Sequence, residues 1–134
     1  MRMVASFFAR RGDRVHLLAV AIGRVVLADW PPARREEYLR TRTLRHFTDR
    51  SITDRDAYLA AVEETAQTGV GVDHEEYLTG VNAVAAAIHG LDSQLIALVW
   101  IVGFSAYFTD EAMARAGEAL RAETRAISRA LGAE

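Results

Sequence analysis

Few side chains in this sequence are of types and spacings that support catalysis or metal binding. There are four histidines and no cysteine, which excludes thiolate nucleophiles, disulfide bonds and cysteine-ligated zinc. No His-x-x-x-His pair brings two zinc ligands onto one helix face. The acidic run Asp73-His74-Glu75-Glu76 offers paired carboxylates, but such a run more often caps a turn or pairs with arginines. A triad of Ser105, Asp73 and His74 has no supporting motif. We therefore predict that the chain is not an enzyme, with no catalytic residue, metal ligand or cofactor.

The composition is that of one globular domain, and we assign residues 1–134 to it. The chain is 51% hydrophobic and 25% charged. Its net charge of -2 gives no excess of positive charge for binding nucleic acid. The arginines of the last predicted helix alternate with Glu118 and Glu123, which is typical of a solvated face. The start of the chain lacks a signal peptide and the longest apolar run is too short to span a bilayer, so we expect a cytoplasmic protein with no membrane partner.

Two apolar runs, residues 81–88 and 95–102, predict the centre of the fold. The turn-forming residues Gly90-Leu91-Asp92-Ser93 between them indicate a β-hairpin. Because side chains alternate across a strand, runs that are apolar at nearly every position must be covered on both faces. We therefore expect both strands to lie in the middle of a sheet.

The remaining segments predict helices that flank this sheet and two short strands. Residues 17–28 are apolar almost all round, which predicts a buried helix, and Gly23 within it indicates close approach of another backbone. Further helices are expected over residues 32–42, over 53–68 with Thr53 as cap, and from a cap at Thr109 to residue 131. Short strands are expected at residues 4–8 and 70–72. The predicted fold class is α+β, with an antiparallel central sheet flanked by helices.

Four segments together resemble the C-terminal effector-binding domain of IclR-type transcriptional regulators. Residues 12–28, GDRVHLLAVAIGRVVLA, are similar to the family's G-S-R-x-P-L-H-A-T-A-x-G-K-A-x-L-A segment. Residues 47–54, 71–80 and 127–132 are similar to its F-T-x-x-T-I-T-D, V-D-x-E-E-x-x-x-G and I-S-x-x-L-G segments. The resemblance implies a profilin- or GAF-like domain that binds a small-molecule effector and forms a homodimer or homotetramer. It implies DNA binding only through a winged helix-turn-helix domain that is absent from this chain.

The resemblance also places the ligand-binding residues. They come from the start of the first helix, from the acidic segment and from the central strands: Val20, Ala21, Ile22, Asp73, Ala83, Trp100 and Val102. If the helix begins near Ala19, the backbone N–H groups of Ala21 and Ile22 have no helical partner and can receive a carboxylate.

This sequence departs from the family where small polar residues usually line the pocket. Val20, Ala83, Trp100 and Val102 are apolar instead. Burying an unpaired polar effector group there costs about 1–3 kcal/mol, so we expect an apolar or aromatic ligand. In the alternative, Trp100 fills the pocket and the domain is a structural dimerisation module. The family's pair of strands before Gly12 is also missing, which we expect to leave an open sheet edge that pairs with a second chain.

Overall fold

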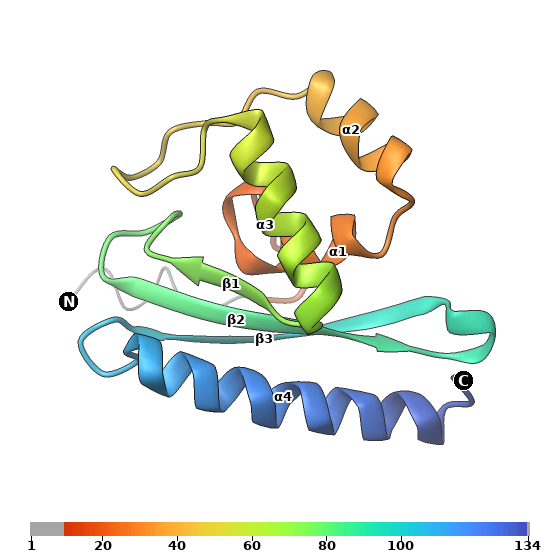
Figure 1. Cartoon of the computed structure of the whole chain (residues 1–134). Helices are drawn as coiled ribbons and strands as arrows, with labels where there is room; N and C mark the ends of the chain where they lie inside the picture. Colours follow the sequence, from red (N-terminus) through yellow and green to blue (C-terminus); the bar gives the residue numbers. More distant parts are fainter. Residues whose placement is uncertain (1–9, 134) are drawn as a thin grey trace.

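The computed structural model describes residues 10–133 as an antiparallel sheet with helices on both faces, as predicted (Figure 1). The strands are β1 (Gly71–His74), β2 (Val81–His89) and β3 (Leu95–Phe104), in the spatial order β1-β2-β3. The predicted hairpin is confirmed, because β2 and β3 pair directly and a short 3-10 helix, η3 (Leu91–Ser93), connects them. The predicted strand at residues 4–8 lies outside the described residues.

The expectation that both hairpin strands are central is wrong for β3 within the described part of the chain. β2 pairs with β1 on one side and β3 on the other, whereas β2 is the only described strand beside β3. The solvent exposure differs accordingly. Residues 81–86 of β2 are all buried, but Ile96 and Ile101 of β3 are 56% and 37% exposed. An apolar run thus marks β3 as a strand without showing what covers it.

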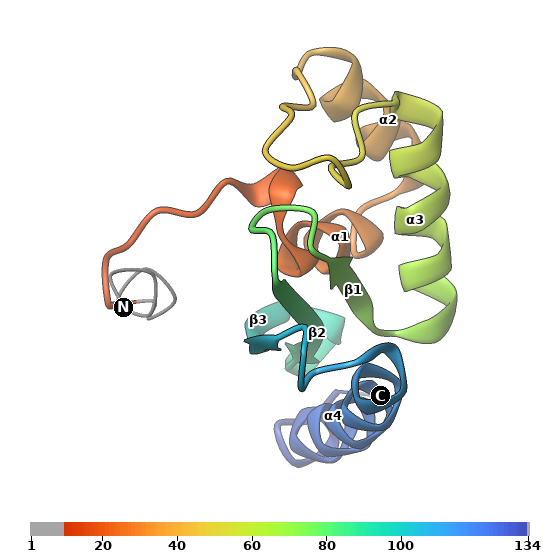
Figure 2. The same ribbon diagram turned by 90° about the vertical axis from the view of Figure 1, so that its left-hand side faces the viewer.

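The helices form two layers around the sheet (Figures 1 and 2). On one side lie α1 (Ala21–Ala28), α2 (Pro32–Arg40) and α3 (Arg55–Thr68), and on the other lies α4 (Asp110–Ala130). The alternation of side chains along β2 serves both layers. Ala83 and Ala85 pack in a cluster with residues of α1, while Val84 and Ala86 pack in a cluster with residues of α4. Small alanines on one face let α1 come close to the strand.

The predicted helix over residues 17–28 is broken in two. A short 3-10 helix, η2 (Leu17–Ala19), is followed by Val20 in an extended conformation, and α1 begins only at Ala21. Gly23 explains the break, because a Cβ at this position would overlap the carbonyl group of Leu17. The chain before α1 folds back over the helix, so it cannot continue the helix. The predicted close approach at Gly23 is therefore confirmed.

The other helix ends follow the predicted signals closely. Helix α3 ends at Gly69 in the left-handed conformation, and Thr109 caps α4 by accepting a hydrogen bond from the N–H of Ala112. The cap of α3 is Asp54 and not Thr53, since the Asp54 carboxylate accepts from the N–H of Ala57 at 2.8 Å. Helix α2 ends at Arg40, two residues earlier than expected. In the part of the chain that is described, no helix is both long and apolar enough to cross a membrane.

Candidate functional site

The structure brings the predicted ligand-binding residues together on the face of the sheet next to α1. Asp73 of β1, Ala83 of β2 and Val102 of β3 are direct cross-strand partners, so they form one row across all three strands. Trp100 lies on the same face, opposite Ala85 and two residues from this row. Residues from three separate segments thus meet on one surface.

The start of α1 reaches the same face through Val20, Ala21 and Ile22. Val20 and Ala21 are buried, Ala21 belongs to one apolar cluster with Ala83, and Ile22 packs against this cluster. Because α1 begins at Ala21, the N–H groups of Ala21 and Ile22 have no carbonyl one turn earlier to bond. They are the two groups predicted from a helix start near Ala19, although α1 begins at Ala21.

Trp100 occupies part of the space between β3 and α1. It is half-buried and packs against the cluster formed by Ala21, Val25, Ala83 and Ala85. Its indole Nε1–H is buried, and no described residue accepts a hydrogen bond from it. An unpaired buried donor of this kind costs about 1–3 kcal/mol. The indole therefore fills space and at the same time offers a donor to a bound molecule.

Among residues 10–133, nothing covers this face along β3, and it is an open surface there. Figure 2 shows that α1, α2 and α3 stand over β1 and β2, with β3 at the margin. The side chains of Leu98, Trp100 and Val102 are accordingly only half-buried. Cavities of about 490, 160 and 620 Å³ lie elsewhere in the fold, and none of them is lined by a predicted ligand-binding residue.

Asp73 is a carboxyl group that the fold buries at the end of β1. The residue is 4% exposed, and its Oδ1 accepts a hydrogen bond from the backbone N–H of Glu76 at 2.8 Å. Burial raises the pKa of Asp73 from 3.8 to about 7, although the hydrogen bond from Glu76 acts in the opposite direction. Near neutral pH a large fraction of the molecules therefore carries a neutral carboxyl group, which can donate a hydrogen bond.

A buried ion pair between Arg24 and Glu76 holds α1 against the turn after β1. The Arg24 guanidinium contacts both carboxylate oxygens of Glu76, at 3.2 Å for Nη1–Oε2, and it also donates to the carbonyl oxygen of Val72. Arg24 is 3% exposed and Glu76 7%. Beneath the pair lies the buried ring of Tyr58, whose centroid is 5.5 Å from the guanidinium carbon.

Sequence reasoning anticipated that the acidic run caps a turn or pairs with arginines, and both uses are confirmed. Asp73 caps the turn and Glu76 holds an arginine. The identity of that arginine was missed. A usable signal was present, because Arg24 is the only charged residue in the apolar segment 17–28 and a buried charge requires a partner.

Two of the segments that carry the resemblance contact each other through hydroxyl groups. The Oγ1 of Thr48 donates to the carbonyl oxygen of Glu75 at 2.6 Å, and the Oγ of Ser51 donates to the carbonyl oxygen of Glu76 at 2.7 Å. The loop before α3 is thereby fixed to the turn after β1. These serine and threonine positions have a structural role that local sequence patterns do not reveal, since their acceptors lie about 25 residues away.

Solved structures with this fold are bacterial transcriptional regulators. The IclR protein of Thermotoga maritima is similar at a TM-score of 0.84 and 30% identity, over 94% of this chain and 51% of that chain. The C-terminal domain of the Escherichia coli regulator KdgR is similar at a TM-score of 0.79 and 27% identity, over 90% of this chain and 74% of that chain. The fold is therefore that of a regulator's C-terminal domain.

The sequence comparisons show the family. The family model described as "Bacterial transcriptional regulator IclR C-terminal" matches residues 2–129. The transcriptional regulator XynR of Escherichia coli K12 is 30% identical over 131 residues, which are 98% of this chain and 52% of XynR. This chain belongs to the IclR C-terminal family, which confirms the resemblance. The relatives regulate transcription and are not enzymes, as predicted. The chain spans about half the length of the curated relatives it matches.

Proposed function

We propose that residues 1–134 form the effector-sensing and oligomerising domain of an IclR-type regulator, and that the ligand is an aromatic acid or a similar, largely apolar molecule. The observation that supports this most directly is the row of Asp73, Ala83 and Val102 beside Trp100 and the start of α1. This surface is apolar except for one buried carboxyl group. The chain would act on DNA only through a DNA-binding domain outside these residues.

The chemistry of the face suits a flat ligand with one acidic group. The ring would lie against Trp100 and Val102. Its carboxylate would accept hydrogen bonds from the orphan Nε1–H of Trp100 or from the N–H groups of Ala21 and Ile22. Asp73 does not repel such an acid while its carboxyl group is neutral. A pKa of about 7 therefore implies stronger binding below neutral pH than above it.

In a second candidate function, Trp100 takes the place of a ligand and the domain serves only for assembly. The packing of the indole against Ala21, Val25, Ala83 and Ala85 favours this alternative. The two functions make opposite predictions for Trp100→Ala. Removal of a pocket wall weakens ligand binding, whereas removal of a plug creates a void that binds an aromatic molecule.

Thermal-shift titrations test the proposal with benzoate, phenylacetate and glyoxylate as probes. We expect the two aromatic acids to raise the Tm of the wild-type chain. A ligand at 100 times its Kd adds about 2.7 kcal/mol, which corresponds to several degrees. We expect glyoxylate to have little effect, because it leaves the apolar face uncovered. Stabilisation by glyoxylate with inert aromatic acids would show the ligand class to be wrong.

Trp100→Ala and Ile101→Ala are a matched pair for locating the binding face. The two residues are neighbours in β3, but Trp100 faces α1 and Ile101 faces the side of α4. We expect Trp100→Ala to remove the thermal shift and Ile101→Ala to keep it. A shift that appears only in Trp100→Ala would support the dimerisation module instead. Equal shifts in both variants would place the ligand elsewhere.

Oligomerisation is the second part of the proposal, and it is supported by the exposed side chains along β3. Ile96 and Ile101 place large apolar groups beside a strand that has one described neighbour. Such an edge is a template for pairing with another chain. We infer that a second copy of this chain covers it, in a homodimer or homotetramer.

A further inference from the structure

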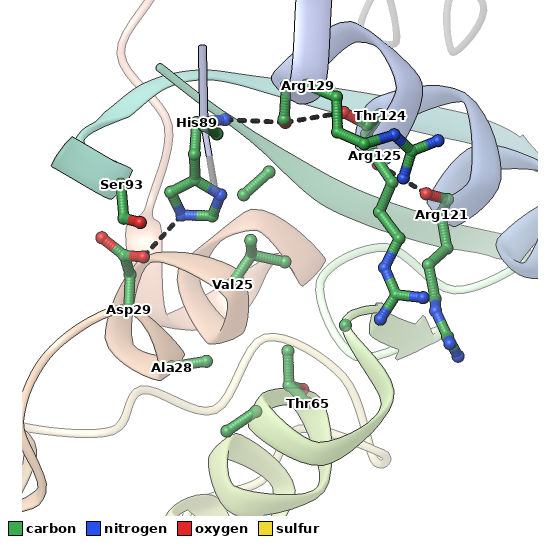
Figure 3. A pocket seen from close by; sticks show the side chains of 15 residues that line it. Val25, Ala28, Asp29, Thr65, His89, Ser93, Arg121, Thr124, Arg125 and Arg129 are labelled. Atoms are coloured by element: carbon green, nitrogen blue, oxygen red, sulfur yellow. Dashed lines mark hydrogen bonds and ion pairs between the residues drawn. The ribbon is translucent and has the colours of Figure 1, made fainter. Parts of the chain in front are cut away.

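A cavity of about 490 Å³ lies at the margin of the sheet where β1 no longer covers β2. The last residue of β2 that pairs with β1 is Ala85, which is opposite Gly71. Beyond this point the ends of α1, α3 and α4 converge around Ala87 and His89 (Figure 3). The volume falls within the range of small-molecule binding sites, about 300–1,000 Å³.

Three arginines of α4 line one wall of this cavity. Arg121, Arg125 and Arg129 stand at four-residue steps, so their side chains project from the same face of the helix (Figure 3). Within residues 10–133, none of the three guanidinium groups has a hydrogen-bond or ion-pair partner. The acid that lines the cavity, Asp29, is already bound to His89 at 2.7 Å.

Like charges at four-residue steps repel each other, so this arrangement destabilises the helix unless something compensates. Arg129 lies in the last turn, where the helix dipole favours a cation, and the stem of Arg121 lies against Gly69 at the end of α3. Arg125 has no such compensation. The first half of the same helix is different, because Arg115 pairs with Glu111 at 2.9 Å.

The rest of the wall limits what the cavity can hold. The hydroxyl hydrogens of Thr65, Thr124 and Ser128 are all used, since each donates to a backbone carbonyl of its own helix. The remaining surface includes the apolar side chains of Val25 and Ala87. The uncommitted donors of the wall therefore include the three guanidinium groups and the hydroxyl group of Ser93, and they stand beside an apolar floor.

We propose that this cavity is a second binding site, for a small organic anion with an apolar body and two negative charges, such as an aryl phosphate or an aromatic dicarboxylate. The arginines bind the charged end in the forked geometry that suits phosphate and carboxylate groups. The apolar part lies against Val25 and Ala87. The site is separate from the row of Asp73, Ala83 and Val102, none of which lines the cavity.

Isothermal titration calorimetry tests the proposal with phenyl phosphate, phthalate and inorganic phosphate. We expect at least one of the two aromatic dianions to bind with a 1:1 stoichiometry. The dianion that binds more tightly identifies phosphate or carboxylate as the preferred group. Inorganic phosphate lacks the apolar body, so we expect it to bind at least about tenfold more weakly. Absence of binding by both aromatic dianions would overturn the proposal.

The double variant Arg125→Gln/Arg129→Gln provides the test of position, with Arg115→Gln as its control on the same helix. Both arginines of the double variant are exposed at the surface, so we expect circular dichroism to show an intact fold. The double variant should lose at least about tenfold in affinity, and the control should stay within about twofold. If Arg115→Gln weakens the affinity for the dianion as much as the double variant does, the attraction of anions is unspecific and the proposed site is wrong.

An NMR titration of the wild-type chain with the same anions tests the position of the site without a variant. Methyl resonances of Ala28 and Ala66, which line the cavity, should shift during the titration, while those of Val102 on the proposed effector face should not. Shifts confined to Val102 would place the anion at the effector face, and the cavity proposal would then be wrong.

Discussion

Asp73 has the unusual property, for a carboxyl group, of holding its proton near neutral pH. The cause is burial at the end of β1, which penalises the charged form, while the N–H of Glu76 recovers only part of this penalty. On the proposed effector face, such a group can change from hydrogen-bond donor to acceptor within the physiological pH range. Its charge state is thus coupled to folding and, in the proposed function, to ligand binding.

The raised pKa of Asp73 predicts that the stability of the chain depends on pH. The folded-state pKa of Asp73, about 7, is higher than the ordinary value of 3.8, so the folded chain holds a proton that the unfolded chain has lost between these two pH values. The free energy of unfolding should therefore fall as pH rises from about 4 to about 7, and this contribution should stay constant above pH 7. A pKa difference of one corresponds to about 1.4 kcal/mol, so the whole effect amounts to a few kcal/mol.

Urea unfolding at pH 5 and pH 8 measures this effect in the wild type and in Asp73→Asn. The amide is neutral at both pH values and can still accept the hydrogen bond from Glu76. We expect the free energy of unfolding of the variant not to fall between pH 5 and pH 8. At pH 8 the variant should therefore be more stable than the wild type. Asp49→Asn, at a fully exposed carboxylate, is the control and should keep the wild-type profile. If Asp73→Asn shows the same pH dependence of unfolding as the wild type, the raised pKa of Asp73 is contradicted.

Single residues also show how far the site could be predicted. The seven ligand-binding positions predicted from motif resemblance lie together in the structure, because β1, β2 and β3 align Asp73, Ala83 and Val102. Their role in binding stays a prediction. Motif resemblance does not identify the partner of Glu76, although the single charge of Arg24 in an apolar segment indicates that Arg24 needs a partner. Arg24 precedes Glu76 by 52 residues, and no local pattern encodes a contact over that distance.

At the scale of the secondary-structure elements, the packing of α1 depends on a glycine. Gly23 lets the backbone at Leu17 lie directly on the helix, and the hydroxyl group of Tyr58 also lies close to the position that a Cβ would take. Gly117 in α4 is also a buried helical glycine, but its neighbour is the side chain of Val70, which can adjust. Glycine therefore has the same intrinsic cost to helix stability at both positions, but the surroundings of the two positions differ.

Gly23→Ala and Gly117→Ala should consequently differ in sign or in size. Alanine is favoured over glycine in a helix by up to about 1 kcal/mol. At Gly23 the new methyl group meets a fixed carbonyl, so we expect a net loss of about 1–3 kcal/mol in the free energy of unfolding. At Gly117 the contact with a Val70 methyl would be 3.1 Å, and we expect a change within about 1 kcal/mol. Chemical denaturation of both variants checks this, and equal losses would contradict the proposed role of the Leu17 carbonyl.

The elements that carry a local signal were predictable, and those that depend on distant contacts were not. The turn residues between β2 and β3, the cap at Thr109 and the stop at Gly69 act within a few residues. The break at Val20 was not predictable, because residues 17–28 are apolar on all sides and show no periodicity that ends there. The arginines of α4 are exposed or half-exposed, as the pattern of a solvated face predicts, but the sequence of a helix does not show the cavity that three of them border.

For the whole molecule, the open side of β3 leads to a prediction about assembly. Native mass spectrometry and light scattering should show a dimer or tetramer of the wild-type chain. Ile96→Lys places a charge on the exposed edge and should shift the population towards the monomer. Ala60→Lys on α3 is the control, because Ala60 is exposed and α3 packs against α1, α2 and β1. A monomeric wild type, or equal effects of both variants, would contradict the assembly.

The molecule as a whole also explains why its two proposed sites are chemically unlike each other. The proposed effector face spans all three strands, and its polar side-chain groups are the Asp73 carboxyl group and the indole N–H of Trp100. The cavity lies at the margin, where helix ends meet and arginine side chains can reach inward. A ligand of the cavity therefore needs a second negative charge, which the proposed effector face does not require.

The shortness of β1 has a mechanical consequence for β2. Four residues of β1 face the first half of a nine-residue strand, so that half is held by hydrogen bonds on both sides. The second half has β3 on one side and, on the other, the hydroxyl group of Ser128 at the N–H of His89. One strand thus combines a stiff half under the effector face with a looser half beside the arginines, and local opening of the domain should start at the hairpin end.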